Sequence, residues 1–299
     1  MMKKKNCLLL LSAWLMCSAP MTAANDIKDL GDSKYSLQVG DLTMVVDAAH
    51  GGKILSFKHQ DSEVISQLRW PESFGSTFWT SPQEEWHWPP VPEYDKRAYT
   101  VEECQDRLVI RSEVSEKLKF RICKEFDVYE DDNSISVTYS IINEDDKERK
   151  VAPWEITRVP NDGLIFFDAP VDGITPAGIM AFESAHGAAW YKADEAQENR
   201  KVNADGKGWL AYANNGLLML KSFADLGEGQ PAPGEAEIQV YVNRGKTYIE
   251  LESQGAYHTL QPGEHLTWTV KWQLAPVDEW QQPSPQLLQK VEELRGMAD

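Results

Sequence analysis

Residues 134–142 read SISVTYSII, and residues 266–274 read LTWTVKWQL. In both stretches apolar and polar side chains alternate with a period of two, which is typical of an antiparallel strand with one face buried and the other solvated. The alternation assigns Trp268 and Trp272 to the buried face, so we expect these two tryptophans to belong to the core.

Weaker alternating runs fill much of the remaining chain, at residues 35–48, 52–58, 98–104, 107–114, 118–128, 151–159, 163–168, 208–213, 216–222, 235–242 and 247–252. Short polar turns separate many of these runs and predict hairpins, and a Gly- and Pro-rich segment at residues 227–235 predicts a long surface loop. This pattern predicts an all-β fold, a large sandwich of antiparallel sheets, in a single domain over residues 25–299.

One helix is expected, close to the C-terminus. Ser284 can cap it, Pro285 occupies its first turn and Gly296 ends it. The helix would cover an edge or a face of a sheet with its apolar side, which is formed by Leu287, Leu288, Val291 and Leu294.

The first residues predict a secretory signal peptide over residues 1–24. Lys3, Lys4 and Lys5 precede an apolar run at residues 7–17, and small residues at positions 22–24 suit cleavage before Asn25. The apolar run is much shorter than the roughly 20 residues that a membrane-spanning helix needs. We therefore expect a protein exported to the periplasm or secreted, without insertion into a membrane.

The charge of the chain limits its partners. Removal of residues 1–24 takes away three lysines and no acids, so the net charge of -17 becomes -20. Such a surface repels nucleic acid and anionic membranes, so neutral sugars or peptides fit better. The sequence leaves the oligomeric state open.

Two cysteines follow the signal peptide, Cys104 and Cys123. If residues 99–104, 107–114 and 118–128 form a meander, these cysteines lie on its two outer strands. Two steps of about 4.8 Å between strands exceed the limit of roughly 7 Å between bridged Cα atoms. We expect two free thiols.

Residues 74–95 read FGSTFWTSPQEEWHWPPVPEYD and show neither helical nor strand periodicity. Prolines hold such a segment on a fixed irregular path, and we expect a binding loop. The indoles of Trp79, Trp86 and Trp88 would stack on the apolar faces of sugar rings, while acids and His87 would contact hydroxyls. The alternative is a buried aromatic plug over a sheet.

Three segments resemble the galactose mutarotase (aldose 1-epimerase) superfamily: HGGKILSF at residues 50–57, YIELESQ at residues 248–254, and LQPGE at residues 260–264 with the strand that follows it. Together with the tryptophan-rich segment and WEITR at residues 154–158, they look closest to an uncharacterised family of secreted bacterial proteins within that superfamily. The resemblance implies a β-supersandwich of two large sheets that binds a neutral sugar or oligosaccharide.

The resemblance also implies a catalytic base. Opening a pyranose ring requires a base at the anomeric O1 and an acid at the ring O5. Glu252 matches the family's base, and Glu250, on the same face of the strand, would bind a hydroxyl or raise the pKa of Glu252. The alternative is that an ordinary strand exposes both acids to water.

The sequence departs from the family at the acid, because residues 143–146 and 153–158 contain no histidine. Glu155 could replace the acid if burial keeps it protonated, and His87 could do so if its loop folds over Glu252. Arg158 could hold hydroxyls, but Glu155 and Arg158 would point to opposite faces of a regular strand.

No motif for metal, phosphate or dinucleotide binding and no nucleophile elbow occurs, so neither metal nor cofactor is expected. The acidic runs at residues 130–133 and 144–146 fit solvated turns better than calcium loops. Three hypotheses remain: an aldose 1-epimerase-like enzyme, a non-catalytic carbohydrate-binding protein used with polysaccharides, and a structural or interaction protein of the cell envelope.

Overall fold

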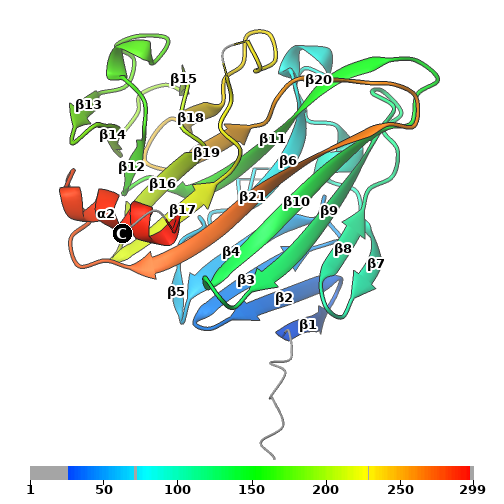
Figure 1. Ribbon diagram of the computed structural model, residues 1–299, viewed down its shortest axis with the longest axis horizontal. Helices are drawn as coiled ribbons and strands as arrows, with labels where there is room; N and C mark the ends of the chain where they lie inside the picture. The colour runs from blue at the N-terminus through cyan, green and yellow to red at the C-terminus, as the bar shows by residue number, and fades with distance from the viewer. Residues whose placement is uncertain (1–25, 71–72, 228, 297–299) are drawn as a thin grey trace, which may run out of the picture.

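The computed structural model describes residues 26–70, 73–227 and 229–296. Two large antiparallel sheets pack face to face, with a short helix near the C-terminal end (Figure 1). The predicted all-β sandwich is therefore confirmed. The predicted signal peptide lies outside the described residues.

The first sheet has eleven strands within the described part of the chain. Its order is β1 (Asp26–Gly31), β2 (Lys34–Val39), β3 (Leu42–Asp47), β4 (Lys53–His59), β6 (Ser76–Ser81), β11 (Arg149–Pro160), β19 (Tyr248–Gln254), β18 (Ile238–Val242) and β15 (Arg200–Ala204). The short strands β5 (Ser62–Glu63) and β20 (His258–Leu260) pair with β4 and β11.

The second sheet has ten strands over the same described ranges. Its order is β13 (Phe182–Ala185), β14 (Ala188–Lys192), β12 (Leu164–Phe167), β16 (Trp209–Asn214), β17 (Leu217–Ser222), β21 (His265–Pro276), β10 (Ser134–Asn143), β9 (Phe120–Tyr129), β8 (Leu108–Arg111) and β7 (Thr100–Cys104). The predicted meander β7–β8–β9 is present, and Cys104 and Cys123 are free thiols, as expected. Trp268 and Trp272 of β21 are buried, as their alternation predicts.

The segment at residues 74–95 differs from its prediction as a loop. Its first part forms β6, which pairs with β4 and β11 in the middle of the first sheet. Every residue of β6 is buried, because one face meets the second sheet and the other lies under the loops that follow. A strand covered on both faces shows no alternation, so the period-two signal was missing. Phe78 of β6 stacks on Tyr139 of the second sheet, with ring centroids 4.2 Å apart.

The predicted C-terminal helix is α2 (Pro285–Leu294). The Ser284 side chain accepts a hydrogen bond from the Leu287 N–H at 3.3 Å, so it is the N-cap. Leu287 and Val291 are buried in a cluster with Phe166 and other side chains of the second sheet. Since the neighbouring Ile165 and Phe167 point into the main core, the helix covers the outer face of that sheet. The short helices are α1 (Pro92–Asp95), η1 (Gln83–Glu85) and η2 (Val171–Gly173).

A buried ion pair joins the two sheets. Glu155 of β11 and Lys221 of β17 are in contact, and both side chains are 0% exposed. Glu155 also accepts hydrogen bonds from Ser76 and Thr157, and the Lys221 ammonium donates to the Thr157 hydroxyl at 3.2 Å. These polar partners compensate for the cost of removing both charges from water.

A second buried lysine, Lys124, also connects the two sheets. Lys124 of β9 donates to the carbonyl oxygens of Gly51 and Gly52 at 2.8 and 2.9 Å. Burial, together with the nearby charge of Lys53, lowers the pKa of Lys124 to about 7. The interior between the sheets therefore contains fixed polar contacts as well as an apolar core.

Replacing Lys221 by methionine should lower the free energy of unfolding by about 3–5 kcal/mol, because it leaves the Glu155 carboxylate buried without its cation. Unfolding in urea would measure the change. The double variant Lys221→Met/Glu155→Gln should recover much of the loss, because it buries no unpaired charge. A single variant as stable as the original chain would contradict the role given to this pair.

Candidate functional site

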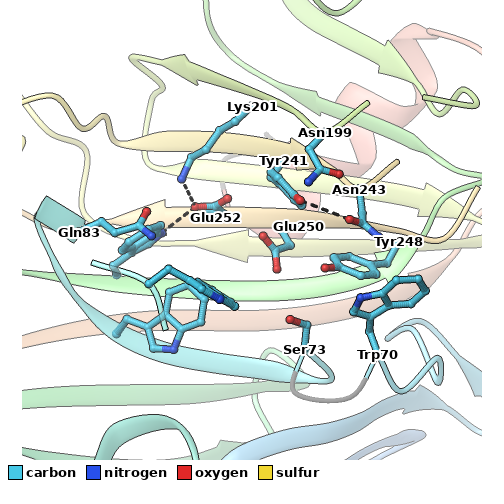
Figure 2. A pocket seen from close by; sticks show the side chains of 13 residues that line it. Trp70, Ser73, Gln83, Asn199, Lys201, Tyr241, Asn243, Tyr248, Glu250 and Glu252 are labelled. Carbon is cyan, nitrogen blue, oxygen red and sulfur yellow. Dashed lines mark hydrogen bonds and ion pairs between the residues drawn. The ribbon is translucent and has the colours of Figure 1, made fainter. Parts of the chain in front are cut away.

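A cavity of about 400 Å³ opens on the first sheet. It lies on the face that points away from the second sheet, since Glu155 of β11 points to the inner face and Trp154 to the cavity. Strands β11, β19, β18 and β15 supply its floor, and Trp70, Ser73, Gln83 and Trp88 form its walls (Figure 2). A volume of this size is typical of small-molecule sites, which run from roughly 300 to 1,000 Å³.

Strand alternation brings the polar floor together. Tyr248, Glu250 and Glu252 of β19 are two residues apart and point to the same face. Strand β18 pairs with β19 and adds Tyr241, which lies opposite Glu250 in the register. Strand β15 then adds Lys201, which lies opposite Tyr241.

Glu252 is held by two donors. Its Oε2 accepts hydrogen bonds from the Trp154 indole N–H at 2.8 Å and from the Lys201 ammonium at 2.9 Å. Burial, together with the nearby Glu250, raises the pKa of Glu252 to about 7, although both donors act in the opposite direction. Glu252 therefore gains and loses its proton close to neutral pH, which suits a general acid or base.

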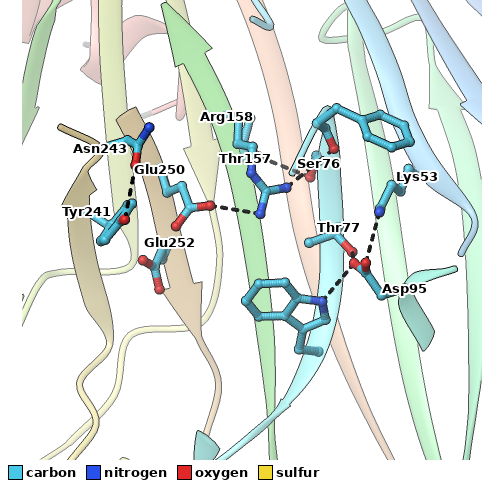
Figure 3. A network of polar contacts seen from close by, with 12 residues as sticks. Lys53, Ser76, Thr77, Asp95, Thr157, Arg158, Tyr241, Asn243, Glu250 and Glu252 are labelled. Carbon is cyan, nitrogen blue, oxygen red and sulfur yellow. Dashed lines mark hydrogen bonds and ion pairs between the residues drawn. The ribbon is translucent and has the colours of Figure 1, made fainter. Parts of the chain in front are cut away.

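Glu250 is paired with Arg158. The Arg158 Nη2 lies 2.8 Å from the Glu250 Oε1, and its Nη1 donates to the Phe74 carbonyl oxygen at 3.3 Å (Figure 3). The guanidinium lies 5.9 Å from the ring centroids of both Trp79 and Tyr248. Arg158 is 2% exposed and is not among the cavity-lining residues, so it supports Glu250 rather than reaching a ligand itself.

A buried hydrogen bond holds the Trp79 indole in place. The indole N–H donates to Asp95 at 3.0 Å, and Asp95 also accepts from Thr77 at 2.8 Å and from the Lys53 ammonium at 3.1 Å (Figure 3). Burial alone would raise the pKa of Asp95, but Lys53 and the hydrogen bonds lower it overall. The Trp79 ring is thus fixed against the cavity.

Of the three tryptophans predicted to stack on a sugar, two line the cavity and one does not. Trp79 and Trp88 line the cavity, and their ring centroids are 6.2 Å apart. Trp86 does not line it: this indole is buried, donates to the Thr80 carbonyl oxygen at 2.8 Å, and packs behind Trp79 and Trp154. The buried-plug alternative therefore describes Trp86, while Trp88 is 61% exposed.

The two acid candidates lie outside the cavity. Glu155 faces the inner core because it alternates with Trp154 along β11, and its carboxylate is used by Lys221. His87 is exposed, has a left-handed backbone with φ of 56°, and does not line the cavity. All six histidines fall in the described ranges, and none lines this cavity.

The cavity also contains residues that the sequence did not indicate. Lys201 and Tyr241 reach the cavity because β18 and β15 are the next strands after β19 in the sheet. The sequences of such short strands do not reveal which strands lie side by side. Trp70 comes from an irregular segment and is 43% exposed. Two others had a signal: Tyr248 shares the alternation of Glu250 and Glu252, and Gln83 lies within the segment predicted to bind.

Solved structures resemble this fold. A putative aldose 1-epimerase from Escherichia coli superposes with a TM-score of 0.59 at 13% identity, over 82% of this chain and 99% of that one. A galactose mutarotase-like protein from Lactobacillus casei gives a TM-score of 0.58 at 11% identity, over 80% of this chain and 99% of that one. A galactose mutarotase-like protein from Clostridium acetobutylicum gives 0.55 at 10% identity, over 82% and 95%. No protein-family model and no curated protein matches the sequence. The fold is thus galactose mutarotase-like, as predicted.

Two further findings concern the described residues only. No group of three or more His, Cys, Asp or Glu side chains is placed there to hold a metal ion. Within the same ranges, no helix is long and apolar enough to cross a membrane.

Replacing Glu252 by glutamine should change how stability depends on pH. The pKa of Glu252 is raised in the folded chain from its ordinary 4.5 to about 7. Between these pH values the folded state binds more protons than the unfolded state, so the free energy of unfolding falls as the pH rises. Relative to Glu252→Gln, the original chain should lose on the order of 3 kcal/mol of unfolding free energy between about pH 4 and pH 8. Urea unfolding at several pH values measures this difference. A difference independent of pH would contradict the raised pKa.

Proposed function

We propose that this chain binds a neutral sugar in the cavity and interconverts its anomers, as an aldose 1-epimerase does. The observation that carries the proposal is Glu252, a buried carboxyl on the cavity floor with a pKa raised to about 7. A group of this kind in a cleft is a candidate for proton transfer.

The reaction needs two proton transfers around one ring. The Glu252 carboxylate takes the proton of the anomeric O1–H while the C1–O5 bond breaks, and the ring oxygen O5 receives a proton. We assign that proton to the Lys201 ammonium, which lies 2.9 Å from Glu252 and is one-third exposed. Rotation about the C1–C2 bond of the open-chain aldehyde and reversal of both transfers give the other anomer and restore both side chains.

The remaining lining residues suit a sugar. Trp79 and Trp88 present indole surfaces to the apolar faces of a pyranose, and Glu250 accepts hydrogen bonds from hydroxyls. The two carboxylates are balanced by Lys201 and Arg158, so the site carries little net charge and favours an uncharged ligand. The sequence adds the expectation that this binding takes place outside the cytoplasm, in an exported protein.

A second candidate function is sugar binding without catalysis. It is favoured by the absence of a histidine among the cavity-lining residues and by the hydrogen bond that already occupies Lys201. Under this alternative, Glu250 and Glu252 only accept hydrogen bonds from the ligand.

Replacing Glu252 by glutamine should slow anomer exchange by about 10²–10⁴-fold, because the general base is lost while the side chain keeps its shape. Exchange between the α and β anomers of neutral sugars would be measured by proton NMR, with saturation transfer from protein to sugar as the test of binding. Lys201→Met should slow exchange as well.

The matched control is Glu279→Gln, which removes an exposed glutamate outside the cavity and should leave the exchange rate unchanged. Saturation transfer with exchange at the rate of the buffer would select the binding alternative. Glu252→Gln with full activity would contradict the assigned base.

A further inference from the structure

The cavity is longer than a single sugar ring. Its floor runs from Trp154 of β11, which lies opposite Gln254 of β19, to Tyr248 of β19, which lies opposite Pro160. The six steps of strand between these two levels span roughly 20 Å. The carboxylates of Glu250 and Glu252 lie between the two ends (Figure 2).

An exposed tryptophan stands at each end. At one end Trp88 lies next to Trp79, which is the cross-strand neighbour of Trp154. At the other end Trp70 lines the cavity with Ser73 and Tyr248, and its carbonyl oxygen accepts a hydrogen bond from the Ser73 N–H at 2.8 Å. Figure 2 shows Trp70 beside Tyr248 and far from Gln83. Gln83 belongs to the Trp88 end, because its carbonyl oxygen accepts a hydrogen bond from the N–H of His87, the residue before Trp88. Trp70 and Trp88 are 43% and 61% exposed, respectively, although large apolar side chains are usually buried.

The polar groups around Trp70 are uncharged. Ser73, Asn199 and Asn243 line this end of the cavity and offer hydroxyl and amide groups. The Asn243 amide is oriented by the Tyr241 hydroxyl at 3.3 Å and by Thr247 at 2.9 Å. Groups that both donate and accept hydrogen bonds, set beside a flat aromatic face, suit a second neutral sugar unit.

We propose that the ligand is an oligosaccharide of at least two neutral sugar units, with one unit over Glu252 beside Trp88 and the next against Trp70. This inference rests on the proposed sugar binding and adds the length of the ligand and a second subsite. One ring cannot contact both tryptophans, so both are used only by a longer chain.

The test compares sugars of one, two and three units. Isothermal titration calorimetry would use glucose with cello- and malto-oligosaccharides, mannose with manno-oligosaccharides, and xylose with xylo-oligosaccharides. For the series that binds, affinity should rise with length. Trp70→Ala should weaken binding of the longest sugar about tenfold and bring it close to that of the monosaccharide.

Tyr129→Ala is the matched control, because Tyr129 is an aromatic side chain of β9 with 48% exposure that does not line the cavity. Both variants remove exposed rings, so equal melting temperatures would show that each chain still folds. Affinity independent of length, or a Trp70→Ala variant that binds like Tyr129→Ala, would overturn the second subsite while sugar binding stands. Absence of binding to every sugar would overturn the proposed function together with this inference.

Discussion

The alternation of strand β11 is the constraint on which both the sandwich and the cavity depend. One face of this strand places Glu155 against Lys221 of the other sheet, and the opposite face places Trp154 in the cavity floor and Arg158 beside Glu250. A shift of one residue in its pairing would exchange these faces and bury the Arg158 guanidinium in the core without Glu250. The interior ion pair and the site therefore select the same register.

The two ion pairs of the site differ in whether the cation can reach a ligand. Arg158 is enclosed between Trp79 and Tyr248 and is used by Glu250, so this pair is a fixed support. Lys201 is one-third exposed and lies on β15, the last strand at its end of the sheet order, so its ammonium has access to a ligand. The raised pKa of Glu252 arises mainly from burial, which means that a ligand that excludes further water would strengthen the same effect.

Sequence reasoning was correct where one face of a strand is buried and the other is solvated, as in β10 and β21, and where a helix has a clear cap, as at Ser284. It was wrong for β6, because burial on both faces removes the alternation. Glu250 and Glu252 were found through the resemblance and their shared face. Lys201 and Trp70 were not, since their place depends on the order of strands and on an irregular segment, neither of which is encoded locally.

The aromatic walls are ordered before any ligand arrives. The indole N–H of Trp79 is tied to Asp95, and that of Trp154 is tied to Glu252. Trp86 fills the space behind both rings, so neither can rotate without breaking a buried hydrogen bond and opening a gap in the core. For the proposed sugar ligand, binding would therefore cost little side-chain entropy on this wall, because none of the interaction between the sugar and the indoles would be used to order the rings. Burying Trp86 thus holds Trp79 and Trp154 in place, so under the proposed function a tryptophan that does not line the cavity would still contribute to recognition.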